Sequence, residues 1–376
     1  MTVTVALVQE TTPGERRVAL DPGAVAKLVK RGIRVRAEKG AGAAARYPDS
    51  AYADAELVDD AATALNACDI LVKIHPPTAE EIEALPRGAV FAGFTQHDRY
   101  PDAVARMRDR DITALSFELV PRITRAQSMD ALSSQGTITG YKGAVMAAEL
   151  SGRLFPMLTT AAGTMRPAQV VVIGAGVAGL QAIATARRLG AQVEAYDIRA
   201  DAREQVESLG ARLIETGVDA TSEGGYAREL TAEEKSRQSE VLAARLQRAD
   251  AVIATAGIPG RPAPKIVSSD MVTDMKNGAV IVDLRAENGG NCELTVPGET
   301  VEHGGVLIAG PANVPSLAAV HASEMYGRNL LALLDPVITD AGVQLDIEDP
   351  VFAACALVHA GVIRHEATRR QIEGEG

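Results

Sequence analysis

Aromatic side chains are nearly absent from this sequence. It has no tryptophan, and aromatic residues make up only 3% of its 376 residues. A surface on which nucleobases or sugars stack is therefore not expected, because such surfaces are built from aromatic rings. Positive charge is also in deficit, with 38 lysines and arginines against 49 aspartates and glutamates and a formal net charge of -11. This imbalance argues against nucleic-acid binding and against a basic patch for anionic lipid.

Cysteines and long apolar runs are equally scarce. Cys68, Cys292 and Cys355 are far apart and show no metal-ligand spacing, so we expect neither a disulfide framework nor a metal site. A reducing cytoplasm is the simplest compartment for such a chain. The most apolar stretch, residues 170–186, is interrupted by three glycines and a glutamine, and a membrane span needs about 20 apolar residues. We expect no direct membrane insertion, and the N-terminus does not resemble a signal peptide.

What remains is a globular composition, with 47% hydrophobic and 23% charged residues. At roughly 100–200 residues per domain, the length predicts two domains. Short apolar runs alternate with amphipathic stretches, which is typical of an α/β fold with a parallel sheet. In the first third, we expect strands at 3–8, 33–38, 70–74, 89–94 and 112–116, with helices at 21–32 and 102–110.

A second alternating unit begins at Gln169. Its expected strands are 170–173, 193–196, 251–255, 279–283 and 306–309. Helices at about 127–150 and 316–334 link the two units, and the C-terminal tail is too short to form a domain. We therefore predict two Rossmann-like domains with parallel sheets: a discontinuous N-terminal domain of residues 1–126 and 320–376, and a cofactor-binding domain of residues 127–319.

The sharpest local motif is a glycine turn, G-x-G-x-x-G, formed by Gly174, Gly176 and Gly179. It directly follows an apolar strand and opens an apolar helix at Val177. The backbone must turn tightly at Gly174, a side chain at Gly176 would block a pyrophosphate, and Gly179 lets helix and strand pack closely. The helix start offers free N–H groups to phosphates. A glycine-rich turn without a ligand is the alternative.

The residues after the next strands extend this prediction. Asp197 lies about 20 residues beyond the turn, where a carboxylate can accept both hydroxyls of the adenine ribose, so NAD(H) is favoured over NADP(H). Arg199 weakens this preference, because an arginine can tolerate a 2′-phosphate. Ile198 between them, and Ala256 and Gly257 after the strand at 251–255, complete the predicted cofactor-binding residues.

Several segments carry a family resemblance. They are ETTPGERRVAL near the start, GGYA at 224–227, PGRPAP at 259–264, GGNC at 289–292 and NVPS at 313–316. With the double alternating unit, they resemble the alanine dehydrogenase and proton-translocating NAD(P) transhydrogenase superfamily over nearly the whole chain. The block PRITRAQSMDALSSQ, residues 121–135, resembles the NAD(H)-binding domain I of the transhydrogenase alpha subunit of the split-subunit type. The chain departs from that pattern at Leu317 and at Arg285-Ala286, which replaces a more apolar pair.

The resemblance implies roles for four polar residues of this block. In the family it forms the loop that holds nicotinamide and ribose against the NADP(H)-bearing domain, and the matching positions are Arg122, Gln127, Asp130 and Ser133. The spacing of the last three predicts one face of a helix, where amide, carboxylate and hydroxyl groups can orient a carboxamide and a ribose. From the pattern alone, a solvated face of a surface helix is the alternative.

A second segment, residues 216–240, is polar and long for a connection inside a compact domain. The family has a mobile loop here that closes over bound NAD(H), and its tyrosine corresponds to Tyr226. A plain surface loop followed by an acidic helix is the alternative.

The resemblance therefore implies direct hydride transfer from NADH to NADP+ on a partner subunit. Proton translocation would occur in a membrane-embedded partner. The chain would form a homodimer and lie peripherally on the cytoplasmic face of the inner membrane through its partners. Transfer between two nicotinamides requires positioning and water exclusion, with no general acid or base.

Two alternatives stay open. One is a stand-alone NAD-dependent amino-acid dehydrogenase of the alanine type, which needs a base and cations for the substrate carboxylate. Arg17 and Lys73 match that family's carboxylate-binding positions. Gln96 stands where its catalytic histidine belongs, His97 follows one residue later, and Glu287 replaces its aspartate. The other alternative is a sensor or scaffold that binds NADH and transfers hydride to nothing.

Overall fold

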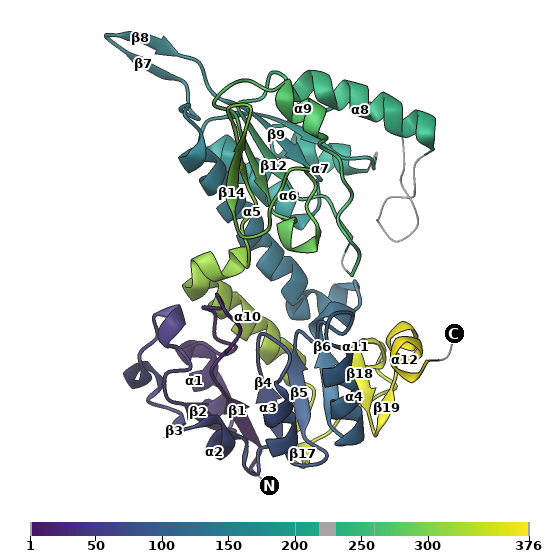
Figure 1. The fold of residues 1–376 in the computed structure, drawn as a ribbon. Helices are drawn as coiled ribbons and strands as arrows, with labels where there is room; N and C mark the ends of the chain where they lie inside the picture. Colours follow the sequence, from purple (N-terminus) through teal and green to yellow (C-terminus); the bar gives the residue numbers. More distant parts are fainter. Residues whose placement is uncertain (1, 200, 218–230, 259, 375–376) are drawn as a thin grey trace. The chain divides into compact units, whose positions relative to one another are not determined.

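The computed structural model describes residues 2–199, 201–217, 231–258 and 260–374 (Figure 1). The chain divides into two compact units. Unit 1 comprises Met1–Gln135 and Pro315–Gly376, and unit 2 comprises Gly136–Val314. Both have the predicted α/β architecture with a mostly parallel sheet. Their boundaries lie later than 126 and earlier than 319, because residues up to Gln135 pack within unit 1. The amide of Gln135, for example, donates to the carbonyl oxygen of Ala322 at 3.0 Å.

Unit 1 is built on an eight-stranded sheet with the order β19-β18-β6-β5-β4-β1-β2-β3. Its parallel strands are β1 (Thr4–Leu7), β2 (Arg34–Glu38), β3 (Glu56–Val58), β4 (Ile70–Val72), β5 (Val90–Gly93) and β6 (Thr113–Ser116). The C-terminal strands β18 (Ala356–His359) and β19 (Val362–Ile363) extend it as antiparallel strands beside β6. The helices are α1 (Pro22–Lys30), α2 (Ala61–Leu65), α3 (Ala79–Ala84), α4 (Pro101–Asp109), α10 (Ala319–Leu334), α11 (Pro350–Cys355) and α12 (Glu366–Glu373), with a small β16–β17 ribbon at Ile338–Thr339 and Gly342–Val343.

Both faces of this sheet are buried. Val5 and Leu7 of β1 belong to one apolar cluster, and Ala6 between them belongs to the cluster on the opposite face. This alternation follows from the two-residue repeat of a strand, and burial on both faces explains why the strands read as continuous apolar runs. The predicted strands of this unit all form, because such runs have no stable solvent-exposed alternative.

Unit 2 is built on a seven-stranded sheet with the order β11-β10-β9-β12-β13-β15-β14. Its strands are β9 (Gln169–Ile173), β10 (Gln192–Tyr196), β11 (Arg212–Leu213), β12 (Ala251–Ala254), β13 (Val280–Asp283), β15 (Val306–Ala309) and the antiparallel edge strand β14 (Thr300–His303). The helices are α6 (Val177–Arg188), α7 (Ala202–Ser208), α8 (Ala232–Leu246) and α9 (Ser269–Thr273). The chain runs from β9 to one side and later returns to β12 on the other, so the strand order reverses at β9. Open α/β sheets bind ligands at the carboxyl ends of strands at such a point.

Helix α5 (Ala131–Leu150) is the long helix expected from residue 127, and it starts four residues later. It runs unbroken through its glycines, because they serve packing. A Cβ on Gly140 would lie 2.0 Å from the carbonyl oxygen of Ala178, and one on Gly143 would lie 2.5 Å from Leu284. These two glycines therefore let α5 approach the backbone of α6 and the end of β13 within unit 2.

A β-hairpin that the sequence did not predict projects from unit 2 (Figure 1). It consists of β7 (Leu158–Thr160) and β8 (Gly163–Met165), and every residue of both strands is exposed. Met157 at its base is 65% exposed and Met165 is 54% exposed. Exposed apolar side chains gathered on one projecting element are a common feature of interaction surfaces.

Candidate functional site

The glycine turn has the geometry that a dinucleotide requires. Gly174, directly after β9, has φ +90°, and a Cβ there would lie 2.9 Å from the backbone of Ala256. A Cβ on Gly179 would lie 1.8 Å from the carbonyl oxygen of Gly174, so the contact between α6 and the turn excludes any side chain. A Cβ on Gly176 would meet nothing within 4 Å. The fold therefore requires glycine at 174 and 179, whereas at 176 open space remains in front of the helix.

The start of α6 faces this space. Gly176 is the N-cap residue and no side chain caps the helix. The first N–H groups of α6, from Val177 onward, therefore lack the usual side-chain acceptor, and the helix dipole adds partial positive charge. These residues fit a pyrophosphate, which would take the free N–H groups and approach the backbone at Gly176.

Asp197 follows β10, and its carboxylate lies against the same turn. One oxygen accepts from the backbone N–H of Ala175 at 2.7 Å and from Arg199 Nη2 at 3.0 Å. The other accepts from the backbone N–H of Arg199 at 2.9 Å and from its Nε at 3.0 Å. All of the roughly four acceptor positions of the carboxylate are therefore in use. Release of the Arg199 side chain would free one position on each oxygen, which matches the two hydroxyls of a ribose.

The loop after β12 completes the turn's surroundings. Ala256 is held by Asn291, whose side-chain amide donates to the carbonyl oxygens of Ala256 and Pro264, both at 2.9 Å. Asn291 is fully buried, and sequence reasoning gave it no role. Its only signal was its place in the GGNC segment at 289–292. Ile198 is partly buried in the apolar cluster on one face of the sheet. Tyr226 lies outside the described residues.

The four polar residues carried over from the 121–135 block all belong to unit 1. Arg122 and Gln127 are exposed, and Gln127 lies in a short 3-10 helix, Thr124–Met129. Asp130 and Ser133 lie together: the Asp130 carboxylate accepts from the Ser133 backbone N–H at 2.8 Å and from its hydroxyl at 2.6 Å. The predicted α-helical face through Gln127, Asp130 and Ser133 is therefore wrong. Asp130 satisfies a free N–H of the first turn of α5, so the α-helix starts after it.

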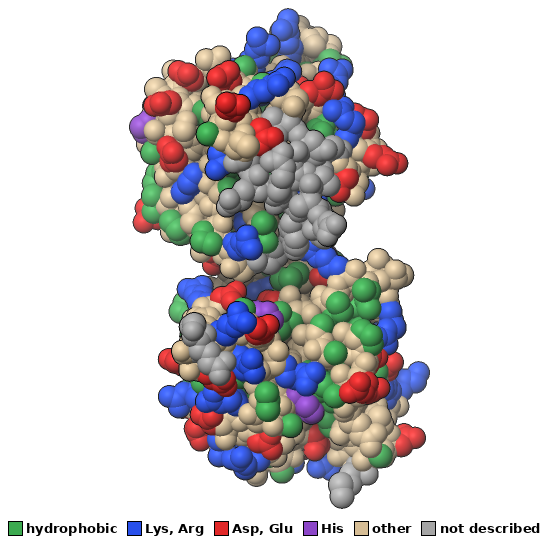
Figure 2. Space-filling model, turned by 90° about the vertical axis from the view of Figure 1, so that its right-hand side faces the viewer, with side chains coloured by type: hydrophobic (Ala, Val, Ile, Leu, Met, Phe, Trp, Pro, Cys, Tyr) green, Lys and Arg blue, Asp and Glu red, His purple; other side chains and the backbone are tan. Residues whose placement is uncertain are grey.

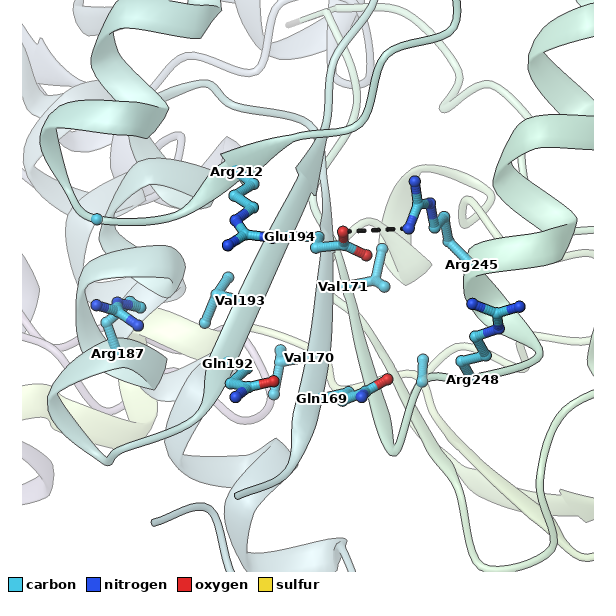
Figure 3. Close-up of a pocket in the computed structure, with 12 residues that line it drawn as sticks. Gln169, Val170, Val171, Arg187, Gln192, Val193, Glu194, Arg212, Arg245 and Arg248 are labelled. Carbon is cyan, nitrogen blue, oxygen red and sulfur yellow. Dashed lines mark ion pairs between the residues drawn. The ribbon is translucent and has the colours of Figure 1, made fainter. Parts of the chain in front are cut away.

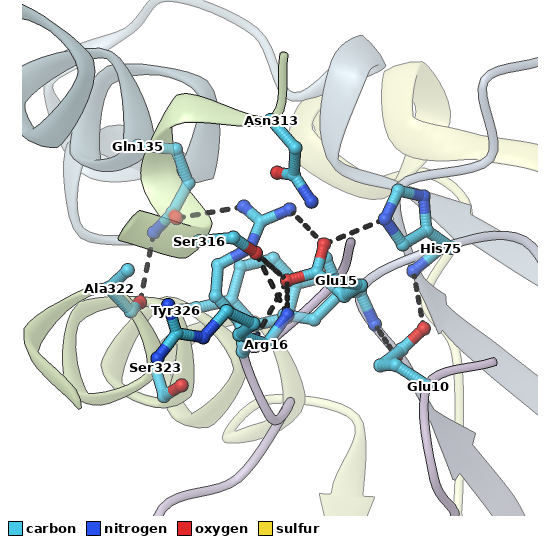
Figure 4. Close-up of polar contacts among 12 residues, drawn as sticks. Glu10, Glu15, Arg16, His75, Gln135, Asn313, Ser316, Ala322, Ser323 and Tyr326 are labelled. Atoms are coloured by element: carbon cyan, nitrogen blue, oxygen red, sulfur yellow. Dashed lines mark hydrogen bonds and ion pairs between the residues drawn. The ribbon is translucent and has the colours of Figure 1, made fainter. Parts of the chain in front are cut away.

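A buried polar network surrounds Arg17 in unit 1 (Figure 4). Arg17 Nη2 lies 2.6 Å from one oxygen of Glu15, and Arg17 Nε donates to the other oxygen at 2.8 Å. His75 Nε2 lies 2.7 Å from the Glu15 carboxylate, and the Ser316 hydroxyl also donates to it. Burial raises the pKa of Glu15, but hydrogen bonds from Arg17 and His75 outweigh it and hold this pKa well below its usual range. The glutamate is thus charged, and it occupies the guanidinium as a substrate carboxylate would.

Lys73 is neutralised in the same way. Its ammonium, only 1% exposed, donates to both oxygens of Glu81 at 2.7 and 2.9 Å. Gln96 donates to His75 Nδ1 at 2.9 Å. His97 is buried with its ring 5.0 Å from the ring of His365. The structure thus places a buried internal glutamate on each of the two cations that an amino-acid substrate would need.

Four arginines line a hollow of about 540 Å³ in unit 2 (Figure 3): Arg187, Arg212, Arg245 and Arg248. The hollow lies at the amino ends of β9 and β10, at the opposite edge of the sheet from the glycine turn. Arg187 and Arg245 occupy the last turns of α6 and α8, where a cation stabilises the helix dipole. Arg245 also pairs with Glu194 at 3.4 Å. Helix-end stabilisation accounts for these two arginines, and the hollow is separate from the glycine-turn site.

The surface shown in Figure 2 carries acidic and basic side chains interspersed, with apolar side chains in small groups. Within the described parts of the chain, no helix is long and apolar enough to cross a membrane. The same residues contain no cluster of three or more histidine, cysteine or carboxylate side chains that could hold a metal ion.

Comparison with known proteins agrees with this site. The family model for the alanine dehydrogenase/PNT N-terminal domain matches residues 6–139, and the model for the C-terminal domain matches residues 143–366. The first of the separate polypeptides of NAD(P) transhydrogenase subunit alpha from Rhodospirillum rubrum is 44% identical over 380 residues, covering 98% of this chain and 99% of that protein. The crystal structure of transhydrogenase from Sinorhizobium meliloti has a TM-score of 0.85 at 40% identity, covering 97% of this chain and 99% of the other.

Similarity to alanine dehydrogenases is weaker. The alanine dehydrogenase of Bacillus subtilis is 29% identical over 376 residues, covering 97% of this chain and 93% of that protein. The resemblance predicted from the 121–135 block is therefore confirmed. This chain belongs to the alanine dehydrogenase/PNT family, and within it groups with the NAD(P) transhydrogenase alpha subunits.

Proposed function

We propose that this chain is the NAD(H)-binding component of an NAD(P) transhydrogenase. NADH bound at the glycine turn is oxidised by direct transfer of a hydride from its C4 to the C4 of NADP+ on a partner subunit. The full-length similarity to the NAD(P) transhydrogenase alpha polypeptide of Rhodospirillum rubrum carries the proposal. The open approach at Gly176 and the uncapped start of α6 support the NAD(H) part of it.

The residues of this chain have a positioning task in that reaction. The hydride carries both electrons and no proton is exchanged at either carbon, so neither partner requires an acid or base. The first turn of α6 holds the pyrophosphate, and Asp197 takes the ribose hydroxyls. The polar residues of unit 1, Gln127, Asp130 and Ser133, orient the nicotinamide half. Ser133 already donates to Asp130 at 2.6 Å, which fixes the direction in which that carboxylate presents its remaining acceptor positions.

Proton translocation and membrane attachment belong to the partner subunits in this proposal. The chain would lie at the cytoplasmic face of the inner membrane by binding a membrane-embedded and an NADP(H)-binding subunit. A homodimer is also proposed, and the projecting hairpin supports it. Leu158 at 44% exposure and Met165 at 54% offer apolar area that a second copy could cover.

The substitution Asp130→Ala is expected to lower the transhydrogenation rate by roughly 100-fold, because it removes a group that positions the reacting half of the cofactor. The assay mixes the purified chain with the NADP(H)-binding component of a related transhydrogenase. It follows NADH-dependent reduction of a spectrally distinct NADP+ analogue, and turnover must need both components. The matched control is Asp335→Ala, an exposed unit 1 carboxylate outside the 121–135 block. An unchanged rate in Asp130→Ala would contradict the assigned role.

An amino-acid dehydrogenase activity is not expected. Glu15 and Glu81 already neutralise Arg17 and Lys73, both inside unit 1, so no free buried cation is left among these two for a substrate carboxylate. Incubating the chain alone with L-alanine and NAD+ should give no NADH absorbance above that of an enzyme-free control. Steady NADH production proportional to enzyme concentration would establish the dehydrogenase instead. Intact NADH binding without turnover, even with a cognate partner, would indicate a sensor.

A further inference from the structure

Arg285 is a buried cation whose charge the described part of the chain leaves unmatched. It directly follows Leu284, whose backbone N–H bonds to the carbonyl oxygen of Ala254 at the end of β12. The Arg285 Nε is buried and has no hydrogen-bond partner among the described residues. Burial lowers the pKa of Arg285, and the charge of Asp283 only partly opposes this effect. A guanidinium without an anion in such a place costs stability, so its retention calls for an explanation.

The nearby carboxylate is not available as a partner. The two oxygens of Asp283 accept from the backbone N–H of Arg285 at 3.0 Å, the backbone N–H of Cys292 at 3.0 Å and the hydroxyl of Thr295 at 2.7 Å. No ion pair joins Asp283 to Arg285 in the described chain. Asp283 therefore shapes the backbone around Arg285 and leaves the guanidinium free.

The guanidinium lies at the crevice of the glycine turn. A Cβ on Gly257 would lie 2.6 Å from Arg285 Nε and 2.7 Å from Nη2, so only glycine at 257 lets the arginine occupy its place. The preceding residue, Ala256, has its backbone 2.9 Å from where a Cβ of Gly174 would stand. A continuous chain of contacts therefore leads from the first glycine of the turn to the guanidinium, all within unit 2 and at the carboxyl ends of β9, β12 and β13.

We propose that Arg285 binds the pyrophosphate of the dinucleotide, donating N–H groups to a phosphate oxygen opposite the start of α6. The inference rests on the proposed function, because it adds a residue to the same NAD(H) site. The pyrophosphate is the anionic part of the dinucleotide beside the turn, and a guanidinium matches phosphate oxygens in charge and shape. The free protein holds the arginine at a cost, and ligand binding offsets that cost.

The test uses the full-length chain and measures binding, with three ligands that differ in one part each. NADH contains pyrophosphate and nicotinamide, ADP-ribose contains pyrophosphate alone, and AMP contains neither. We expect Arg285→Met to weaken NADH and ADP-ribose by the same factor, roughly 10- to 100-fold, because a hydrogen bond to a charged group is lost. AMP binding should not change. Arg285→Lys keeps the charge without the planar fork and should lie between the two.

A second readout separates this role from a structural one. Without ligand, Arg285→Met should unfold at the same or a higher temperature than the unsubstituted chain, since it removes an unmatched buried charge. The control is Arg248→Met, in the hollow at the other edge of the sheet, which should leave all three affinities unchanged.

The contrary outcomes are distinct. Unchanged affinities in Arg285→Met, or a lower unfolding temperature with unchanged affinities, would show a packing residue and overturn the inference. A loss confined to NADH would place the arginine at the nicotinamide and also overturn it. If the unsubstituted chain binds none of the three ligands, the proposed function itself fails.

Discussion

Replacing Gly176 with valine should abolish NADH binding while leaving the fold intact. A side chain at this position meets no protein atom within 4 Å, and the backbone angles, φ -78° and ψ -169°, suit any L-residue. The branched side chain would fill the space that the pyrophosphate needs. Loss of two hydrogen bonds from the start of α6 to phosphate, each worth about 1.5–3 kcal/mol, corresponds to roughly 100-fold weaker binding or more. Fluorescence titration of the chain with NADH measures this directly.

The matched variant is Gly179→Ala, three residues further along the same turn. Its Cβ would lie 1.8 Å from the carbonyl oxygen of Gly174, so the turn and α6 must move apart. Such overpacking costs about 1–3 kcal/mol or more, and we expect a lower unfolding temperature. Gly176→Val should change stability by no more than about 1 kcal/mol, the usual range for an N-cap substitution. If both variants lose stability equally, the separation of a ligand glycine from a packing glycine is wrong.

Removing the charge of Glu81 should have the largest effect on the stability of unit 1. Glu81→Gln leaves the ammonium of Lys73, which is 1% exposed, without a counter-charge. Breaking a buried ion pair in this way costs about 3–5 kcal/mol. Glutamine keeps an acceptor for the backbone N–H of Thr78, which bonds Glu81 at 2.7 Å in the capping box of α3, so the loss reflects the charge. Urea unfolding followed by circular dichroism gives the free energy.

The double substitution Lys73→Met with Glu81→Gln is the control for that effect. Replacing a buried ion pair by neutral groups of similar size is often nearly neutral, so most of the lost stability should return. If the double variant is as unstable as Glu81→Gln alone, the cost comes from packing and not from an unmatched charge. Recovery would also show that Lys73 has a structural charge pair, which agrees with the expected lack of amino-acid dehydrogenase activity.

Local features were predictable from the sequence because their physics is local. The run from Val170 to Val177 contains an apolar strand, a turn that needs glycine and a helix start, and each depends on neighbours in the chain. The segments 170–173 and 193–196 form β9 and β10 nearly as expected. The family resemblance was also readable, because short blocks such as residues 121–135 keep their order and spacing.

Competition between local choices produced the clearest error. The spacing of Gln127, Asp130 and Ser133 suits a helix, but an aspartate can also satisfy a free backbone N–H at a helix start. The carboxylate of Asp130 bonds the N–H of Ser133 at 2.8 Å, and α5 begins at Ala131. The hairpin at 158–165 was missed because the segment is short and has no clear apolar alternation.

The two α/β units, the glycine turn with its approach for a pyrophosphate, and the family could all be read from the order of the residues. Which charges are matched became visible in three dimensions alone. Lys73 meets Glu81 across a strand and a helix, Arg17 meets Glu15 inside a buried network, and Arg285 lies against Gly257 without a described partner. Pairing and burial depend on which segments the fold brings together, and a one-dimensional pattern does not contain those distances.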